Sequence, residues 1–188
     1  THYTPEKPLY VVAIGAITNV ASALLLKPEI ADNVVVVWLG GNGFEWHDNH
    51  EFNCMQDVAS VRVVYASGAP LVILPCMGVV SAFTTTEPEL NYWLKGKNPL
   101  ADYLAQNTID EAESYAHGKP WSRVIWDVTA IAWLVNEDNR FMNDELIKCP
   151  VPEYDLRYAA DSYGHFIKYV YNIKRDALFE DLFKKLGE

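Results

Sequence analysis

The chain has 188 residues, half of them hydrophobic, which is enough for the core of one domain but too few for two ordinary ones. Its formal net charge of -10 makes nucleic acid and membrane surfaces poor partners, because an acidic protein repels phosphate groups. Cys54, Cys76 and Cys149 have no CxxC spacing, which argues against a disulfide scaffold and favours a reducing, cytoplasmic setting.

The N-terminal residues differ in pattern from a signal peptide. Its first eight residues have no signal-peptide features and do not begin with methionine, so we expect that the chain was processed or cut from a longer one. The apolar stretch from Leu9 to Leu26 approaches the length of a membrane span, but Gly15 and Asn19 interrupt it. We interpret this stretch as a strand followed by a helix.

Three apolar runs predict buried strands, at Leu9–Ile14, Val34–Leu39 and Leu71–Leu74. Helices are expected between them, one capped by Thr18 and one by Asp57. This alternation is typical of parallel β-α-β units, and it predicts an α/β fold with a mostly parallel, Rossmann-like sheet flanked by helices.

Beyond residue 85 the sequence indicates mainly helices. A capping box at Thr86–Glu89 is expected to start the first of them. The helices are predicted at residues 90–94, 99–116, 126–135 and 174–186. The exceptions are an irregular segment at 141–163 and a half-exposed strand at 167–173. We find no linker, so residues 1–188 are expected to belong to a single domain.

Two polar segments follow predicted strands, the turn at 15–19 and the loop at 40–53. Ligands of open α/β sheets bind beyond the carboxyl ends of the strands, which makes both segments candidates for a site. Each also has a structural interpretation, because such turns often end in a helix cap and loops are usually polar. In the loop, His47 and His50 lack a cysteine that would complete a zinc set, and we interpret them as solvated.

Asp127 is an acid inside the apolar segment 124–134. Burying a carboxylate is costly unless a cation or hydrogen-bond donors compensate it, which favours a ligand-binding role. Capping of the helix that follows is an equally open alternative.

Five segments, in order along essentially the whole chain, resemble the inosine–uridine-preferring nucleoside hydrolases. The resemblance consists of Ala13–Ala21 with the family's "GPLTNLA" turn, Gly40-Gly41 and Glu51-Phe52-Asn53 with "GG…EFN", Asp57-Val58-Ala59 with the acid and helix that follow, Ser67–Leu71 with "SGxPL", and Trp126-Asp127 with "HD".

This resemblance implies that the chain is the C-terminal portion of a nucleoside hydrolase domain. Such enzymes hydrolyse the N-glycosidic bond of a ribonucleoside to free base and ribose, as in purine and pyrimidine salvage. A calcium ion holds the ribose hydroxyls and a water, and an aspartate takes the proton of that water. The transition state resembles an oxocarbenium ion, which nearby carboxylates stabilise.

The resemblance also assigns roles to particular residues. Thr18, through its backbone carbonyl, and Asp127 match calcium ligands of the family. Glu51 and Asn53 match ligands of the ribose hydroxyls, and Asn49 lies near the place of another ribose-binding asparagine.

Two departures from the family pattern stand out. The family's DxDxxxDD motif, which supplies the general base and several calcium ligands, is absent, and we expect a missing N-terminal segment to provide it as another chain or within a homo-oligomer. Trp126 stands where several members have a histidine, and an indole cannot protonate a leaving base. The chain alone is therefore expected to bind calcium weakly and to be inactive. The alternative is a non-catalytic nucleoside- or sugar-binding module, or an inactive fragment.

Overall fold

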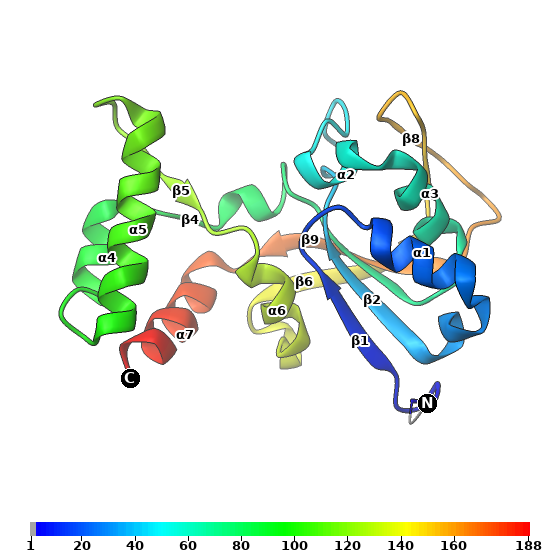
Figure 1. The fold of residues 1–188 in the computed structure, drawn as a ribbon, viewed down its shortest axis with the longest axis horizontal. Helices are drawn as coiled ribbons and strands as arrows, with labels where there is room; N and C mark the ends of the chain where they lie inside the picture. The colour runs from blue at the N-terminus through cyan, green and yellow to red at the C-terminus, as the bar shows by residue number, and fades with distance from the viewer. Residues whose placement is uncertain (1–2) are drawn as a thin grey trace.

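A computed structural model describes residues 3–188 of the chain; Thr1 and His2, the start of the segment without signal-peptide features, lie outside the described residues. A five-stranded sheet in the order β1-β2-β3-β9-β6 forms its centre (Figure 1). These strands are β1 (Leu9–Ala13), β2 (Val34–Leu39), β3 (Leu71–Leu74), β9 (Phe166–Ile173) and β6 (Met142–Lys148).

The three strands that we expected to be parallel neighbours, β1, β2 and β3, are adjacent and parallel in the structure. β1 pairs in parallel with β2, β2 with β3, and β3 with β9, whereas β6 is antiparallel to β9. β2 and β3 are almost wholly buried, and strands buried on both faces read as continuous apolar runs, which is why they were visible in the sequence. The prediction that β1 is also buried was wrong, because it is the edge strand and its residues are exposed or half-buried. The α/β fold with a mostly parallel sheet is thereby confirmed.

β6 shows that the prediction of an irregular segment at 141–163 was wrong. This strand carries several charged side chains and lacks an apolar run, and it is held by its pairing with β9. One of its acids, Asp144, pairs with Lys168 of β9 at 3.0 Å. An antiparallel edge strand of this kind needs only one buried face, so its sequence signal is weaker.

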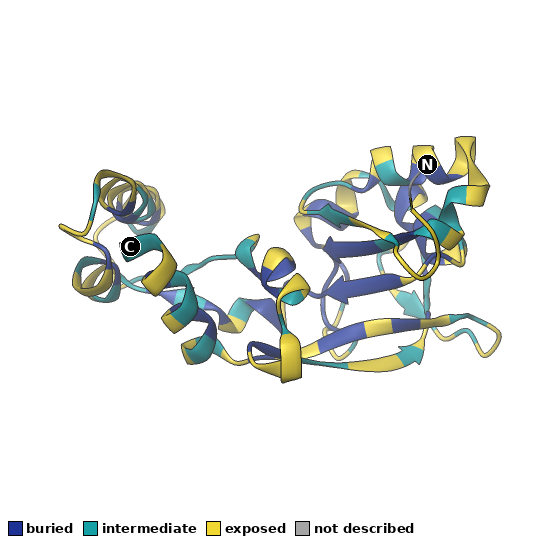
Figure 2. Ribbon diagram, turned by 90° about the horizontal axis from the view of Figure 1, so that it is seen from below, coloured by how far each residue is buried: buried dark blue, intermediate teal, exposed yellow. Residues whose placement is uncertain are grey.

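Helices pack on both faces of the sheet, where they form two separate cores. Figure 2 shows the inner strands as buried and the outer surfaces of the helices as exposed. α1 (Thr18–Leu26) and α3 (Val58–Ala66) share one core with Val36 and Trp38 of β2. The alternate residues Val37 and Leu39 face the second core, to which α5, α6 and α7 contribute. Because successive side chains of a strand point to opposite faces of the sheet, β2 contributes residues to both cores.

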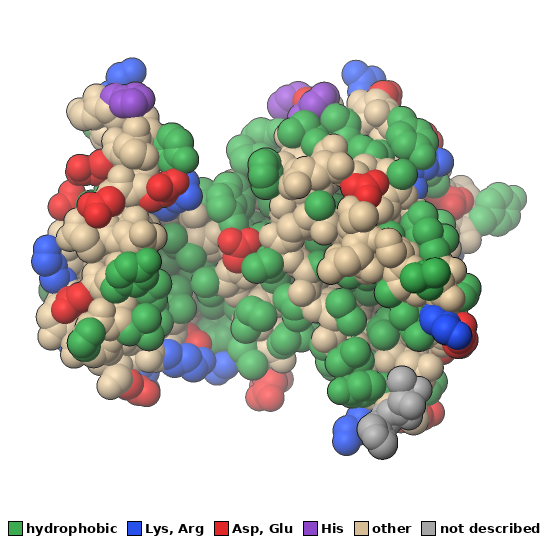
Figure 3. All heavy atoms as spheres, in the orientation of Figure 1, with side chains coloured by type: hydrophobic (Ala, Val, Ile, Leu, Met, Phe, Trp, Pro, Cys, Tyr) green, Lys and Arg blue, Asp and Glu red, His purple; other side chains and the backbone are tan. Residues whose placement is uncertain are grey.

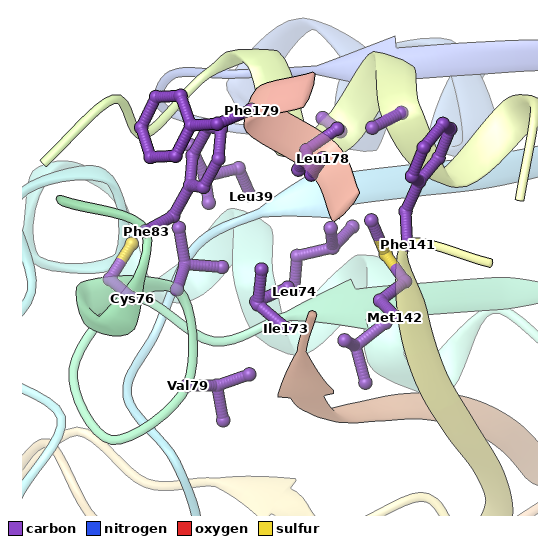
Figure 4. Close-up of a cluster of buried hydrophobic side chains, with 14 of the residues drawn as sticks. Leu39, Leu74, Cys76, Val79, Phe83, Phe141, Met142, Ile173, Leu178 and Phe179 are labelled. Carbon is purple, nitrogen blue, oxygen red and sulfur yellow. The ribbon is translucent and has the colours of Figure 1, made fainter. Parts of the chain in front are cut away.

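The second core joins the sheet to the C-terminal helix. Leu39, Leu74, Met142 and Ile173 of the sheet meet Phe83, Phe141, Leu178 and Phe179 there (Figure 4). The rings of Phe83 and Phe179 stack with centroids 4.0 Å apart. This contact ties α7, which closes the chain, to the segment after β3.

The remaining elements surround this framework. The helices are α2 (Phe52–Gln56), α4 (Glu87–Trp93), α5 (Pro99–Ala116), α6 (Val128–Leu134) and α7 (Arg175–Gly187). The short strands are β4 (Thr84–Thr85), β5 (Arg123–Val124), β7 (Val151–Pro152) and β8 (Tyr158–Ala159). Three 3-10 helices lie at Pro28–Asn33, Val80–Ala82 and Glu137–Asn139.

The expected capping box before α4 does not form. Thr86 makes no side-chain capping hydrogen bond. Glu89 instead accepts a hydrogen bond from the Thr85 hydroxyl and pairs with Arg175 of α7. An ion pair between helices outweighs the local cap here. Within residues 3–188, no helix is both long and apolar enough to cross a membrane.

Candidate functional site

A cavity of about 450 Å³ lies beyond the carboxyl ends of β1, β2 and β3. This is the edge at which open α/β sheets bind their ligands, and the volume is within the range of small-molecule sites. Its walls are formed by Ile14, Leu39, Asn42, His50, Glu51, Phe52, Asn53, Cys76, Met77, Trp126 and Asp127.

Glu51 is a buried acid that caps the start of α2. Its Oε1 accepts a hydrogen bond from the amide of Asn53 at 3.0 Å, and its Oε2 accepts from the amides of Gly41 at 2.8 Å and Cys54 at 2.9 Å. An ionised carboxylate can accept about four hydrogen bonds. Glu51 is therefore fixed in place and keeps the capacity for one further donor.

Gly41 explains why this arrangement needs glycine. Its φ is +72°, a conformation that other residues rarely adopt, and a side chain there would overlap the Tyr158 hydroxyl. The sharp turn directs the Gly41 amide toward Glu51, which is ten residues later in the chain.

Asn53 links the ends of two strands. Its Nδ2 donates to the carbonyl of Leu39 at 2.9 Å and lies 3.5 Å from that of Ile14. Its Oδ1 accepts no hydrogen bond from the residues that the structure describes. The amide group is thereby held with its oxygen available to a ligand donor such as a hydroxyl.

Asp127 lies on the cavity wall where α6 begins, and its carboxylate makes no capping hydrogen bond. The capping alternative is therefore not realised. Partial burial raises the pKa of this carboxyl despite a hydrogen bond from its own backbone amide. A carboxylate that is partly desolvated and has no ion-pair partner among the described residues is suited to bind a cation.

Thr18 does not reach the cavity. Its hydroxyl donates to Asp57 at 2.6 Å, and its carbonyl accepts from the hydroxyl of Ser22 at 2.8 Å. The N-cap position of α1 is Ile17, so the expected capping role of Thr18 is also wrong. Asp57, in contrast, caps α3 as predicted, accepting from the amide of Ser60 at 3.0 Å.

Asn49 is buried behind the cavity wall rather than on it. Its Oδ1 accepts from the amide of Asn42 at 2.6 Å, and its Nδ2 donates to the sulfur of Cys54 at 3.0 Å. Both ends of its amide are occupied within the loop. Asn49 therefore shapes the loop, and the structure does not bring it to the ligand space.

The structure adds wall residues that the sequence interpretation missed. Asn42 bridges the loop, donating to the carbonyl of Asp48 at 3.1 Å and accepting from the amide of Met77 at 3.2 Å. Ile14 was assigned only to its strand. His50, interpreted as a solvated loop residue, lines the cavity. The position of Asn42 and Met77 just after strand ends was the available signal.

The residues present do not form a complete calcium site. In residues 3–188, no group of three or more His, Cys, Asp or Glu side chains is placed to hold a metal ion. Calcium takes six to eight oxygen ligands, and affinity increases with the number of charged ones. Asp127 fits as one such ligand of a larger site.

Comparisons with known proteins agree with this geometry. The family described as "Inosine-uridine preferring nucleoside hydrolase" matches residues 2–171. Among curated relatives, pyrimidine-specific ribonucleoside hydrolases RihA of Klebsiella pneumoniae (strain 342) and Escherichia coli O1:K1 are 26% and 28% identical over 139 residues. That alignment covers 71% of this chain and 44% of each relative.

Solved structures show the same fold. An inosine-uridine preferring nucleoside hydrolase from Bacillus anthracis superimposes with a TM-score of 0.73 at 21% identity, covering 96% of this chain and 60% of that one. A plant nucleoside hydrolase, PpNRh1, gives 0.78 at 18% identity, covering 95% and 61%. The chain thus spans about half the length of its curated relatives. On the family match over residues 2–171, the chain belongs to the inosine–uridine preferring nucleoside hydrolase family.

Proposed function

We propose that this chain contributes the sugar-binding cavity of an enzyme that hydrolyses the N-glycosidic bond of ribonucleosides to free base and ribose. The observation that carries the proposal is the convergence of Glu51, Asn53 and Asp127 on one cavity. These residues come from segments more than 70 positions apart, and the cavity lies where the fold binds ligands.

Glu51 and Asn53 are suited to hold the sugar. Each presents a fixed oxygen that can accept a hydrogen bond from a ribose hydroxyl. Because their positions are set by backbone hydrogen bonds, little freedom is lost on binding. The carboxylates of Glu51 and Asp127 also favour the positive charge that develops on the sugar as the bond to the base breaks.

We further propose that Asp127 supplies one ligand to a calcium ion in the complete enzyme. The other acidic ligands and the general base would come from a segment outside residues 1–188, as another chain or from a further copy. Thr18 does not line the cavity, and its role as a further ligand through the backbone carbonyl stays a prediction.

The free edge of the sheet supports such a partner. Within residues 3–188, β1 pairs with β2 only, and its other edge is open. Tyr10 is 49% exposed and Ile14, just after the strand, is 50% exposed. Open apolar edges of this kind recruit another strand or surface. The three buried, unpaired cysteines are in keeping with the proposed cytoplasmic setting.

The test is release of free base from uridine and inosine by the protein expressed from its complete reading frame, followed by chromatography with calcium or with a chelator. We expect turnover that the chelator abolishes. Saturable nucleoside binding without base release would instead favour the alternative, a sugar-binding module. A protein that neither binds nucleosides nor releases free base would overturn the proposal.

A further inference from the structure

Cleavage of an N-glycosidic bond expels a nucleobase, which is a poor leaving group unless it receives a proton. An acid on the cavity wall could supply this proton. Among the described residues that line it, the titratable side chains are His50, Glu51, Cys76 and Asp127. Trp126 also lines it, but its indole has no proton of suitable acidity.

Three of these groups are unsuited to the role. The two oxygens of Glu51 already accept three hydrogen bonds from backbone amides, so this side chain is placed as an acceptor and not as a proton donor. Burial raises the pKa of the Cys76 thiol, which makes it too weak an acid. Asp127 has to be ionised in the role proposed above. His50 remains.

His50 has the geometry of an oriented imidazole. Its Nδ1 lies 3.2 Å from the Oδ2 of Asp48, and its backbone amide donates to the Oδ1 of the same residue at 2.9 Å. The contact at Nδ1 leaves Nε2 for another partner. The side chain is 56% exposed, so solvent reaches the ring as well as the cavity.

Asp48 is itself held in place. Its carbonyl accepts from Asn42, and its carboxylate has a lowered pKa, chiefly because of the hydrogen bond from the His50 backbone. His47 contacts the same carboxylate oxygen, with its Nε2 3.1 Å from Oδ2, but does not line the cavity. Figure 3 shows histidine side chains gathered on the surface above α2.

We propose that His50, oriented by Asp48, is the general acid that protonates the departing nucleobase. This rests on the proposed function. As the bond between C1′ and the base nitrogen breaks, its electron pair passes to the base, which takes the proton from Nε2 of His50. A water molecule forms the new bond to C1′ and gives its proton to a carboxylate base. The imidazole then regains a proton from solvent.

Two substrates that differ only in their need for an acid test the proposal. Natural ribonucleosides need a proton on the leaving group, whereas a nitrophenyl riboside expels a stable phenolate without one. In the protein from the complete reading frame, His50→Gln should lower kcat for uridine or inosine by about 10²–10³-fold and change that for the nitrophenyl riboside by about 3-fold or less. His47→Gln, which keeps Asp48 and leaves the wall intact, is the matched control and should change neither.

The results distinguish failure of the role of His50 from failure of the proposed function. Unchanged nucleoside turnover in His50→Gln would overturn the role of His50, and so would an equal loss on both substrates, which indicates a structural effect. An unmodified protein that hydrolyses neither substrate would instead overturn the proposed function, and with it the role of His50.

Discussion

The two walls of the cavity differ in how they are built. Glu51 and Asn53 are fixed by hydrogen bonds to backbone groups of the loop after β2 and of the strand ends. Asp127, which the start of α6 contributes to the cavity wall, has no capping hydrogen bond and a pKa raised by burial. Glu51 and Asn53 are thus held by groups of the chain itself, whereas Asp127 has no ion-pair partner among residues 3–188.

Because of this difference, Glu51 and Asn53 are expected to serve both stability and binding, whereas Asp127 is expected to serve function only. The groups on the first wall satisfy the backbone amides of a sharp turn, so they contribute to stability as well as to binding. Asp127 contributes little to stability, because a partly desolvated carboxylate without a partner is unfavourable. We therefore expect Asp127 to act when a cation binds in the cavity or when positive charge develops on the substrate.

The largest expected effect is on activity and falls on Asp127. Asp127→Ala in the complete enzyme should lower kcat/KM for ribonucleosides by at least about 10³-fold, since it removes a charge that acts on the transition state. Its free energy of unfolding, measured with urea, should be unchanged within about 0.5 kcal/mol. Activity near that of the unmodified protein would place the cation or the charge elsewhere.

Glu51 should behave in the opposite way with respect to stability. Glu51→Ala leaves the amides of Gly41, Asn53 and Cys54 without their acceptor, and we expect the free energy of unfolding to fall by about 3 kcal/mol. Glu51→Gln keeps one acceptor oxygen and should lose less. Equal stabilities of these two variants and the unmodified protein in urea unfolding would contradict the view that this wall is built by Glu51.

Substitution of Asp57, which lies outside the cavity wall, should have a smaller effect on the free energy of unfolding. It caps α3 and accepts from the hydroxyls of Ser60 and Thr18, which lower the pKa of its carboxyl. Asp57→Ala should cost about 1 kcal/mol. Because the pKa is lower in the folded state, the contribution is complete above about pH 4 and is lost as the pH falls through the folded value. Unfolding curves of the variant and the unmodified protein should therefore converge in acid.

The sequence predicted best those elements whose sequence signal is local. Val34–Leu39 and Leu71–Leu74 are strands with the predicted bounds, because burial on both faces leaves an apolar run. β6 was missed because its pairing with β9 is a long-range interaction that its polar sequence does not display. Glu89 was misassigned for the same reason, since its partner Arg175 lies 86 residues away.

The candidate site was predicted in part. The family motifs indicated Glu51, Asn53 and Asp127, and all three line one cavity. The motifs could not show that the Thr18 hydroxyl would donate a hydrogen bond to Asp57. Nor could they show that the side-chain amide of Asn49 would form its hydrogen bonds with Asn42 and Cys54. Their hydrogen-bonding capacity is the same in either place, and only the tertiary structure decides which partner they meet.

The smallest expected effect concerns calcium and residues 1–188 alone. With one free carboxylate on the cavity wall, the dissociation constant should exceed 1 mM, so that 1 mM calcium stabilises the chain by less than about 0.4 kcal/mol. Thermal unfolding with and without calcium measures this. A stabilisation of several kcal/mol would show that these residues form a complete metal site by themselves.

The central claim, that this cavity binds the sugar, is tested most directly by a crystal structure of the protein from its complete reading frame with ribose and calcium. We predict that ribose hydroxyls lie within hydrogen-bond distance of Oε1 of Glu51 and Oδ1 of Asn53, and that a carboxylate oxygen of Asp127 binds the metal. Ribose bound with its hydroxyls away from Glu51 and Asn53, or calcium bound without Asp127, would contradict the account.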